Sequence, residues 1–307
     1  MITPYYTLSD KLKSIYNERV YKIPIDGGFT CPNRDGTKAF GGCAFCNEKG
    51  SGEHTLQLSI KNQVLRGIEI AKEKNKGNKF IAYFQNFSST YADIETLTSR
   101  YQEALVSDDV VGLAIATRPD CITYEVAKII KTVAFHRTVW VELGLQTANE
   151  DTAKTFNRQY SNADFLQAVK ILNDLDIPVV VHLIVGLNGE DFEDIKRTVA
   201  FINTVKIDGI KIHSLFILKN TALGERFLRG DFSPISREFF VLAVAYILTH
   251  IPKTITVHRL TGDGEKSEIL APVWTMEKKK NLNSINNYMR QNGLTQGCFY
   301  EENYAKE

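Results

Sequence analysis

Three cysteines lie close together in a glycine-rich segment near the start of this 307-residue chain. Eleven residues separate Cys31 from Cys43, and two residues separate Cys43 from Cys46. Thiolates hold iron–sulfur clusters, and three thiolates on a cluster of four irons leave one iron without a protein ligand. An open coordination position is where a metal centre performs chemistry rather than bracing a fold. The spacing therefore predicts a reactive iron–sulfur cluster in this segment.

A structural zinc site is the alternative, because Cys-x2-Cys is also a zinc signature. A structural zinc ion takes four protein ligands, and the nearest candidate for the fourth is His54. The sequence holds no second cysteine pair at this spacing. The iron–sulfur cluster is the favoured interpretation, and the zinc alternative would make the chain a non-catalytic, zinc-stabilised RNA-binding protein.

The composition is that of an ordinary globular protein, with 43% hydrophobic and 24% charged residues. The formal net charge of +1 neither requires nor excludes a polyanionic partner. Five cysteines argue against a disulfide framework, and we expect Cys121 and Cys298 to be buried free thiols. The strongest apolar run, residues 177–187, is too short to cross a membrane. These features predict a cytoplasmic protein without a membrane partner.

Short β-branched runs alternate with amphipathic stretches, which is the pattern of a parallel sheet with crossover helices. Strands are expected at 20–25, 80–84, 111–116, 139–145, 178–185, 209–217 and 254–258, and a last helix at 276–290. The number of units falls short of eight, which favours an incomplete (β/α)6 barrel over a closed one. We expect the α/β partial barrel to cover 1–258, with the cysteine segment at 27–50, and a C-terminal extension to cover 259–307.

Polar side chains gather where the expected strands end, which is the active-site edge of such barrels. They are Gln85 and Asn86, Glu142 and Gln146, His182, and Lys211 with His213. Strand alternation directs Glu142 and Gln146 to one side. Such groups are costly to bury unless they are hydrogen-bonded, so they predict either a polar ligand or a water-filled polar layer. Arg158 could clamp a carboxylate or form a surface salt bridge.

Several motifs together resemble those of a known family. They are the cysteine segment with Phe45 before its last cysteine, Thr117-Arg118-Pro119-Asp120, Glu142-Leu143-Gly144-Leu145-Gln146, Lys211-Ile212-His213 and His258-Arg259-Leu260-Thr261-Gly262-Asp263. The chain resembles radical S-adenosylmethionine (SAM) enzymes of the class typified by the catalytic subunit of Elongator. More closely, it resembles the bacterial YtqA/YhcC family, whose Gram-positive branch is called MnmL. The resemblance extends over nearly the whole chain.

This resemblance implies a [4Fe-4S] cluster on Cys31, Cys43 and Cys46, with SAM bound to the open iron. One electron would cleave SAM to methionine and a 5′-deoxyadenosyl radical. The resemblance also implies cofactor contacts from Phe45, Gln85, Asn86, Glu142, Gln146 and Arg158, with Arg158 on the SAM carboxylate. Gln85 and Asn86 stand where many relatives carry Gly-Gly-Glu, which weakens their assignment. His182, Lys211 and His213 remain candidates for contact with the substrate.

For the MnmL branch the implied substrate is tRNA, in which wobble 5-carboxymethylaminomethyluridine becomes 5-aminomethyluridine. An electron donor such as flavodoxin or ferredoxin is implied as well. The chain itself adds only two basic runs, 72–79 and 278–280, and such runs are more often solvated helix faces than RNA contacts. A radical SAM enzyme acting on a small molecule or a protein is the alternative within the class.

Overall fold

The computed structural model describes residues 3–48, 50, 55–74, 76–262 and 264–301. Its strands are β1 (Val20–Ile25), β2 (Lys79–Phe84), β3 (Val110–Thr117), β4 (Thr138–Gln146), β5 (Val179–Val185), β6 (Gly209–Ser214), β7 (Ile217–Leu218), β8 (Thr256–Arg259) and β9 (Ile269–Ala271). Its α-helices are α1 (Leu8–Tyr16), α2 (Ile60–Glu73), α3 (Ile94–Ala104), α4 (Tyr124–Val133), α5 (Glu150–Thr155), α6 (Asn162–Asp174), α7 (Phe192–Ile202), α8 (Ala222–Leu228), α9 (Arg237–Thr249) and α10 (Lys278–Gln291).

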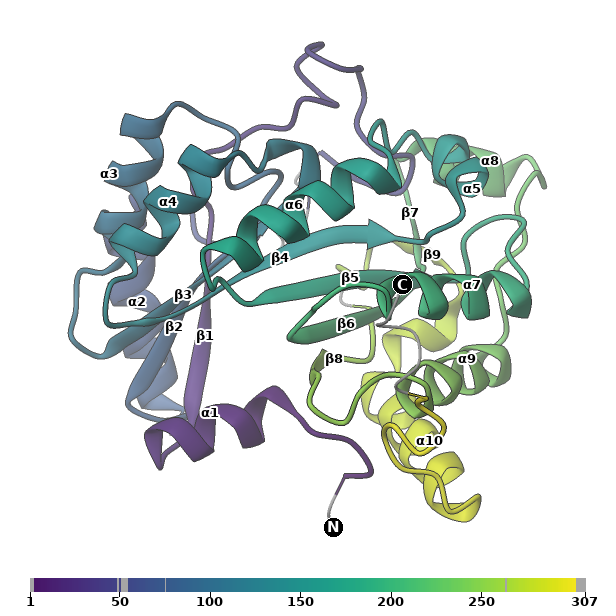
Figure 1. Ribbon diagram of the computed structural model, residues 1–307. Coiled ribbons are helices and arrows are strands. Elements are labelled where there is room, and N and C mark those ends of the chain that lie inside the picture. The colour runs from purple at the N-terminus through teal and green to yellow at the C-terminus, as the bar shows by residue number, and fades with distance from the viewer. Residues whose placement is uncertain (1–2, 49, 51–54, 75, 263, 302–307) are drawn as a thin grey trace.

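The described residues form a seven-stranded sheet in the order β1-β2-β3-β4-β5-β6-β8. Every neighbouring pair in this sheet is parallel, and β1 and β8 remain its two open edges. Figure 1 shows the crossover helices along the outer side of a curved sheet. The predicted incomplete barrel is confirmed as a half-barrel of the α/β class.

Strand alternation separates a helix-facing core from a concave face. In β2, Phe80 and Phe84 belong to the main core beneath the helices, whereas Ile81 and Tyr83 pack on the concave side. Helix α1 was not predicted, and its buried Leu8 and Leu12 pack against this concave cluster. Because α1 lies at the amino ends of the strands (Figure 1), the concave face stays accessible from the carboxyl ends.

The sixth strand is shorter than the sequence predicts. The ladder between β5 and β6 ends at the pair Val185 and Ser214, because Gly186 turns the chain with a φ of 101°. Beyond that pair β6 has no partner along β5, so the chain leaves the sheet. Ile217 and Leu218 pair antiparallel with residues of β9 instead. The predicted strand over 209–217 is therefore wrong at its end.

The C-terminal region continues from the last sheet strand through β9 and α10, which packs against α9. The division at residue 258 falls inside β8 and stays a prediction. Cys121 is buried, as expected, but Cys298 is exposed, so that expectation was wrong. Among the described helices, none is both long and apolar enough to cross a membrane.

Candidate functional site

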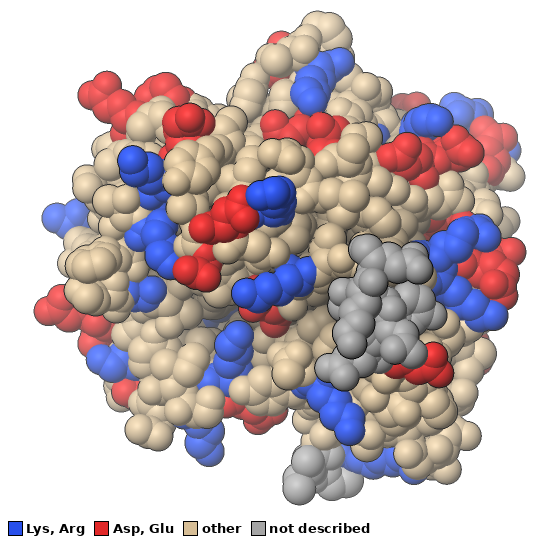
Figure 2. Space-filling model, in the orientation of Figure 1, with Lys and Arg blue, Asp and Glu red and all other residues tan. Residues whose placement is uncertain are grey.

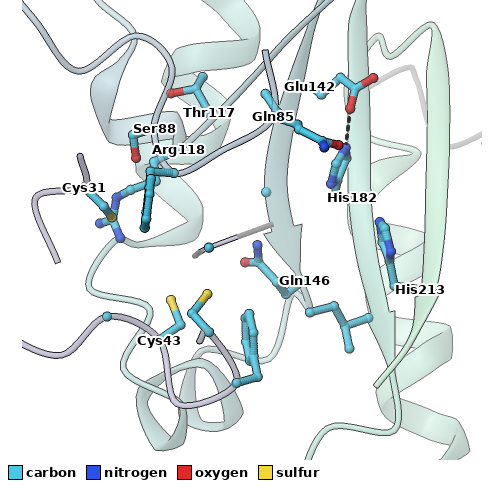
Figure 3. A pocket seen from close by; sticks show the side chains of 18 of the residues that line it. Cys31, Cys43, Gln85, Ser88, Thr117, Arg118, Glu142, Gln146, His182 and His213 are labelled. Atoms are coloured by element: carbon cyan, nitrogen blue, oxygen red, sulfur yellow. Dashed lines mark hydrogen bonds and ion pairs between the residues drawn. The ribbon is translucent and has the colours of Figure 1, made fainter. Parts of the chain in front are cut away.

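A cavity of about 280 Å³ opens at the carboxyl ends of the sheet strands. Among its lining residues are Cys31, Cys43, Phe45, Cys46, Gln85, Glu142, Gln146, His182, Lys211 and His213. Figure 3 shows Cys31 and Cys43 on one side of the cavity and His182 and His213 on the other. The structure therefore brings together most of the residues that the sequence predicts for the site. Asn86 and Arg158 do not line this cavity.

The cysteine segment is held in shape by contacts with residues 156 and 157, directly after α5. Within the segment, Cys46 N donates to Cys43 O at 2.9 Å and Gly42 N donates to Asn33 O at 2.8 Å. Across to the distant chain, Asn33 Nδ2 donates to Asn157 O at 2.5 Å, and Asn157 Nδ2 donates to Gly42 O at 2.8 Å. Gly42 has a φ of 79°, which a glycine adopts without strain.

The three thiols suit a cluster better than a single metal ion. In the part of the chain that is described, no group of three His, Cys, Asp or Glu side chains could hold one metal ion. The zinc candidate His54 lies outside the described residues. Arg34 and Arg118 line the cavity with the cysteines and place positive charge where iron-bound thiolates would carry negative charge. The donor set fits a [4Fe-4S] cluster with one open iron.

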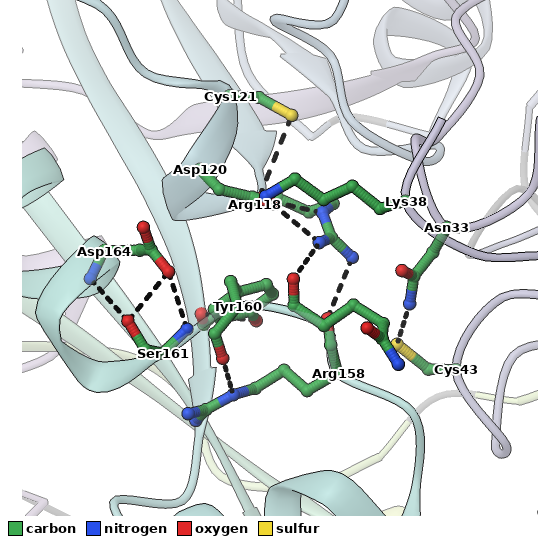
Figure 4. Close-up of polar contacts among 12 residues, drawn as sticks. Asn33, Lys38, Cys43, Arg118, Asp120, Cys121, Arg158, Tyr160, Ser161 and Asp164 are labelled. Carbon is green, nitrogen blue, oxygen red and sulfur yellow. Dashed lines mark hydrogen bonds and ion pairs between the residues drawn. The ribbon is translucent and has the colours of Figure 1, made fainter. Parts of the chain in front are cut away.

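The two closest thiols interact with each other. Their mutual hydrogen bond raises the pKa of Cys43 well above its ordinary value and lowers the pKa of Cys46. The charge of Arg34 acts in the same direction on Cys46 and lowers its pKa further. Cys43 also accepts from Asn33 Nδ2 at 3.8 Å (Figure 4). The two thiols therefore share one proton more readily than either thiol ionises alone.

Glu142 is the centre of a buried polar network on the concave face. Its Oε2 accepts from Lys211, from Tyr83 Oη at 2.8 Å and from His182 Nε2 at 2.9 Å. Its Oε1 accepts from Trp140 Nε1 at 2.9 Å. Burial by itself would raise the pKa of Glu142, but Lys211 and His182 together hold it well below its ordinary value. The carboxylate is therefore ionised and fully hydrogen-bonded, as a buried charge must be.

A β-bulge positions Gln146. The register between β4 and β5 shifts between Gly144 and Gln146, and Gln146 has a φ of 64°. The hydroxyl of Tyr160 lies 2.8 Å from both Gly144 O and Gln146 Oε1. A Cβ at position 144 would lie 2.3 Å from Gln146 Nε2, so a larger residue there would displace the Gln146 side chain. Gln146 is thereby fixed between the cysteines and the histidines, as Figure 3 shows.

Arg158 lies elsewhere than the resemblance implies. It is 1% exposed, and its guanidinium donates to Leu145 O, Thr147 O and Tyr160 O, each at 2.9 Å. Figure 4 shows it beneath Tyr160, with Arg118 above. The guanidinium thus fastens the end of β4 to the following loop, and its placement gives no support to a contact with the SAM carboxylate.

Replacing Arg158 with lysine is expected to lower the free energy of unfolding by about 1–3 kcal/mol for each buried carbonyl that loses its donor. A single ammonium group cannot replace a planar fork that serves three carbonyls. Urea unfolding of the metal-free protein, followed by circular dichroism, measures the loss. The exposed Arg229→Lys variant is the control and should unfold like the wild type. Unchanged stability combined with lost SAM binding would instead support a contact between Arg158 and SAM.

The sequence reasoning missed several cavity residues. Arg34, Tyr83, Arg118 and Arg259 line the cavity but were not assigned to the site. Arg118 donates through Nε and Nη2 to the two oxygens of Asp120, at 2.9 and 2.8 Å. Tyr83 could have been predicted, because it lies two residues before Gln85 and strand alternation directs both side chains to the same side.

Comparisons with known proteins agree with this geometry. The sequence model of the Radical SAM superfamily matches residues 31–202, and that of the Radical_SAM C-terminal domain matches residues 207–291. This chain belongs to the radical SAM superfamily and is an enzyme of that class. It is 38% identical to YtqA of Bacillus subtilis (strain 168) over 97% of this chain and 93% of the relative. It is 32% identical to YhcC of Escherichia coli (strain K12) over 91% of this chain and 90% of the relative.

Two comparisons relate the chain to enzymes of the Elongator class. The tRNA uridine(34) acetyltransferase of Methanocaldococcus infernus is 31% identical over 61% of this chain and 35% of the relative. The solved structure of Methanocaldococcus infernus Elp3 lacking its N-terminus superposes with a TM-score of 0.71 at 20% sequence identity. That superposition covers 90% of this chain and 64% of the Elp3 chain and confirms the fold. The cofactors of the superfamily are a [4Fe-4S] cluster and SAM.

Proposed function

We propose that this enzyme acts on the wobble uridine of tRNA and converts 5-carboxymethylaminomethyluridine to 5-aminomethyluridine. The observation that carries the proposal is a three-thiol cavity at the carboxyl ends of the half-barrel strands, whose opposite wall presents histidines from β5 and β6. The similarity to a tRNA uridine(34) acetyltransferase supports an RNA substrate. The residues assigned to SAM and substrate by resemblance remain predictions within this proposal.

Side chains at the two ends of the cavity would have different roles. Cys31, Cys43 and Cys46 would hold the cluster, and SAM bound there supplies a radical that removes a hydrogen atom from the substrate. Gln146, held by Tyr160, would orient the bound SAM between the cysteines and the histidine wall. Phe45 packs on Phe156 at 5.3 Å between ring centroids and would keep water from the cluster.

The first basic run of the sequence lies away from the cavity. Lys72 is in the last turn of α2 and Lys79 begins β2, at the amino end of the sheet, whereas the cavity opens at the carboxyl ends. On the face in Figure 2, acidic and basic side chains are interspersed. The Lys38 ammonium, at the cavity end of the sheet, pairs with Asp120 at 2.6 Å. We therefore expect the RNA to be held mainly by the cavity and its rim.

The test is an anaerobic reaction of the reconstituted enzyme with SAM, a reductant and tRNA that carries wobble 5-carboxymethylaminomethyluridine. We expect 5′-deoxyadenosine to form and the nucleoside mass to fall to that of 5-aminomethyluridine. SAM cleavage with an unchanged nucleoside would refute the tRNA substrate and favour a small-molecule or protein substrate. A protein that binds zinc and no iron would refute the radical chemistry itself.

The reaction also needs an electron and a reducing compartment. We propose a flavodoxin or ferredoxin as the donor, because a cluster of this class works at low potential. Free cysteines such as Cys121 persist in a reducing environment, so we place the reaction in the cytoplasm.

A further inference from the structure

His182 and His213 form one wall of the cavity, called here the histidine wall. Each has one ring nitrogen to which no role has been given. His182 uses Nε2 to donate to Glu142 at 2.9 Å, which fixes Nδ1 as the lone-pair nitrogen. The side chain is 20% exposed and lines the cavity. His213 also lines the cavity, and its Nε2 is buried with no partner among the described residues. The two ring centroids are 5.2 Å apart, so the rings face one small volume.

Cations outnumber carboxylates around this wall. The charged groups that act on the two imidazoles are Glu142 on β4, Lys211 on β6 and Arg259 on β8, and His258 on β8 interacts with His182. Lys22 on β1 and Tyr83 on β2 interact with Glu142 instead. Burial lowers the pKa of His182 to about 4, with the charge of Lys211 adding to the effect. Burial, His182 and Arg259 together hold the pKa of His213 well below its ordinary value.

An unpartnered imidazole in a positive field is poised for an anion. Both rings are neutral at pH 7, and each can bind a proton once a negative charge offsets the neighbouring cations. The protonated ring then donates a charge-assisted hydrogen bond to that anion. Cys31 and Cys43 lie on the other side of the cavity (Figure 3), so this wall is separate from the cluster end.

We propose that His182 and His213 form a carboxylate-binding subsite, which receives the carboxymethylamino group of the substrate base and takes up one proton as the carboxylate binds. The inference rests on the proposed function, because it names the part of that substrate which the wall recognises. The proton comes from solvent and resides on an imidazole, and no bond within the substrate changes. The proposed product lacks the carboxylate, so the subsite should bind the product more weakly than the substrate.

Binding of nucleosides tests the subsite without any turnover. Histidine labelled with ¹⁵N in the metal-free protein is titrated by NMR, with each signal assigned from a single histidine variant. We expect 5-carboxymethylaminomethyluridine to raise the titration midpoint of His182 or His213 to about pH 7 or above, which for His182 is a shift of about three pH units. 5-Aminomethyluridine should leave both midpoints in place.

Three results would overturn the subsite. One is an equal response to the two nucleosides, and another is no response to either at millimolar concentration. The third is an equal response to uridine 5′-monophosphate, which would assign the wall to a phosphate of the RNA backbone instead. Because this experiment needs neither iron nor catalysis, it decides the subsite even if the enzyme fails to convert tRNA.

Kinetics with tRNA give a second measurement. Replacing His213 with glutamine should raise KM for the carboxylate-bearing tRNA about tenfold or more, because a charge-assisted hydrogen bond is lost. Because a proton is taken up on binding, the wild-type KM should rise with pH between the midpoints of the free and the bound imidazole and level off above the second. This rise should be weaker in the His213→Gln variant. The exposed His136→Gln variant is the matched control, and equal KM values in all three proteins would refute the subsite.

Discussion

Replacing Cys43 with alanine is expected to abolish iron binding, from about four iron atoms per chain to nearly none. Two remaining thiols cannot hold a four-iron cluster that already lacks a fourth protein ligand. Formation of 5′-deoxyadenosine should fall to the background, since SAM has no iron to bind. Iron analysis after anaerobic reconstitution and chromatography of the reaction products measure both effects.

The matched control for Cys43 is Cys298→Ala, because Cys298 is exposed and does not line the cavity. Its iron content and SAM cleavage should equal those of the wild type. If Cys43→Ala retains its full iron content, the assignment of the three thiols is wrong. Zinc in place of iron in the wild-type protein would support the alternative in which His54, outside the described residues, completes a tetrahedral site with the three thiols.

Replacing Lys211 with methionine is expected to lower the free energy of unfolding of the metal-free protein by about 3–5 kcal/mol at pH 7. The ammonium of Lys211 is 2% exposed and pairs with a carboxylate that is 0% exposed. Its removal leaves a buried negative charge whose hydrogen bonds come from neutral donors such as Tyr83 and Trp140. The measurement is urea unfolding across a range of pH.

The pH dependence of this loss has a definite sign. Without Lys211 the pKa of Glu142 rises, so the folded variant binds a proton that the folded wild type does not. The difference in stability should therefore narrow as the pH falls. The Lys211→Met, Glu142→Gln double variant should recover much of the loss. In contrast, Lys170→Met removes an exposed pair with Asp174 and should change little. A loss of equal size at every pH would contradict the ionised state of Glu142.

The parallel sheet could be predicted because each long strand and its helix carry a local signal. Four of the five residues 80–84 are β-branched or aromatic, and they lie between polar stretches. Residues 60–71 repeat apolar residues at helical spacing. Helix α1 buries only Leu8 and Leu12 within a polar segment, which is too weak a signal to detect. The pairing of β7 with β9 joins segments about 50 residues apart, and no local pattern encodes it.

The sequence allows us to predict which residues form the site and which side of the sheet they face. It does not allow us to predict the contacts that these residues make. Alternation correctly directs Glu142 and Gln146 into one cavity. The same alternation does not reveal the β-bulge, in which Gln146 adopts a left-handed backbone conformation. For Arg158, the sequence shows only a long cationic side chain that follows a strand. The packing of the loop determines whether its guanidinium binds a ligand or backbone carbonyls. Contacts of this kind depend on segments that fold back from elsewhere.

The hydrogen bonds between the cysteine segment and residues 156 and 157 are made by the polypeptide alone. They tie the backbone around Cys43 to the loop that follows α5. A change in that loop would therefore disturb the cluster, although the loop supplies no cysteine.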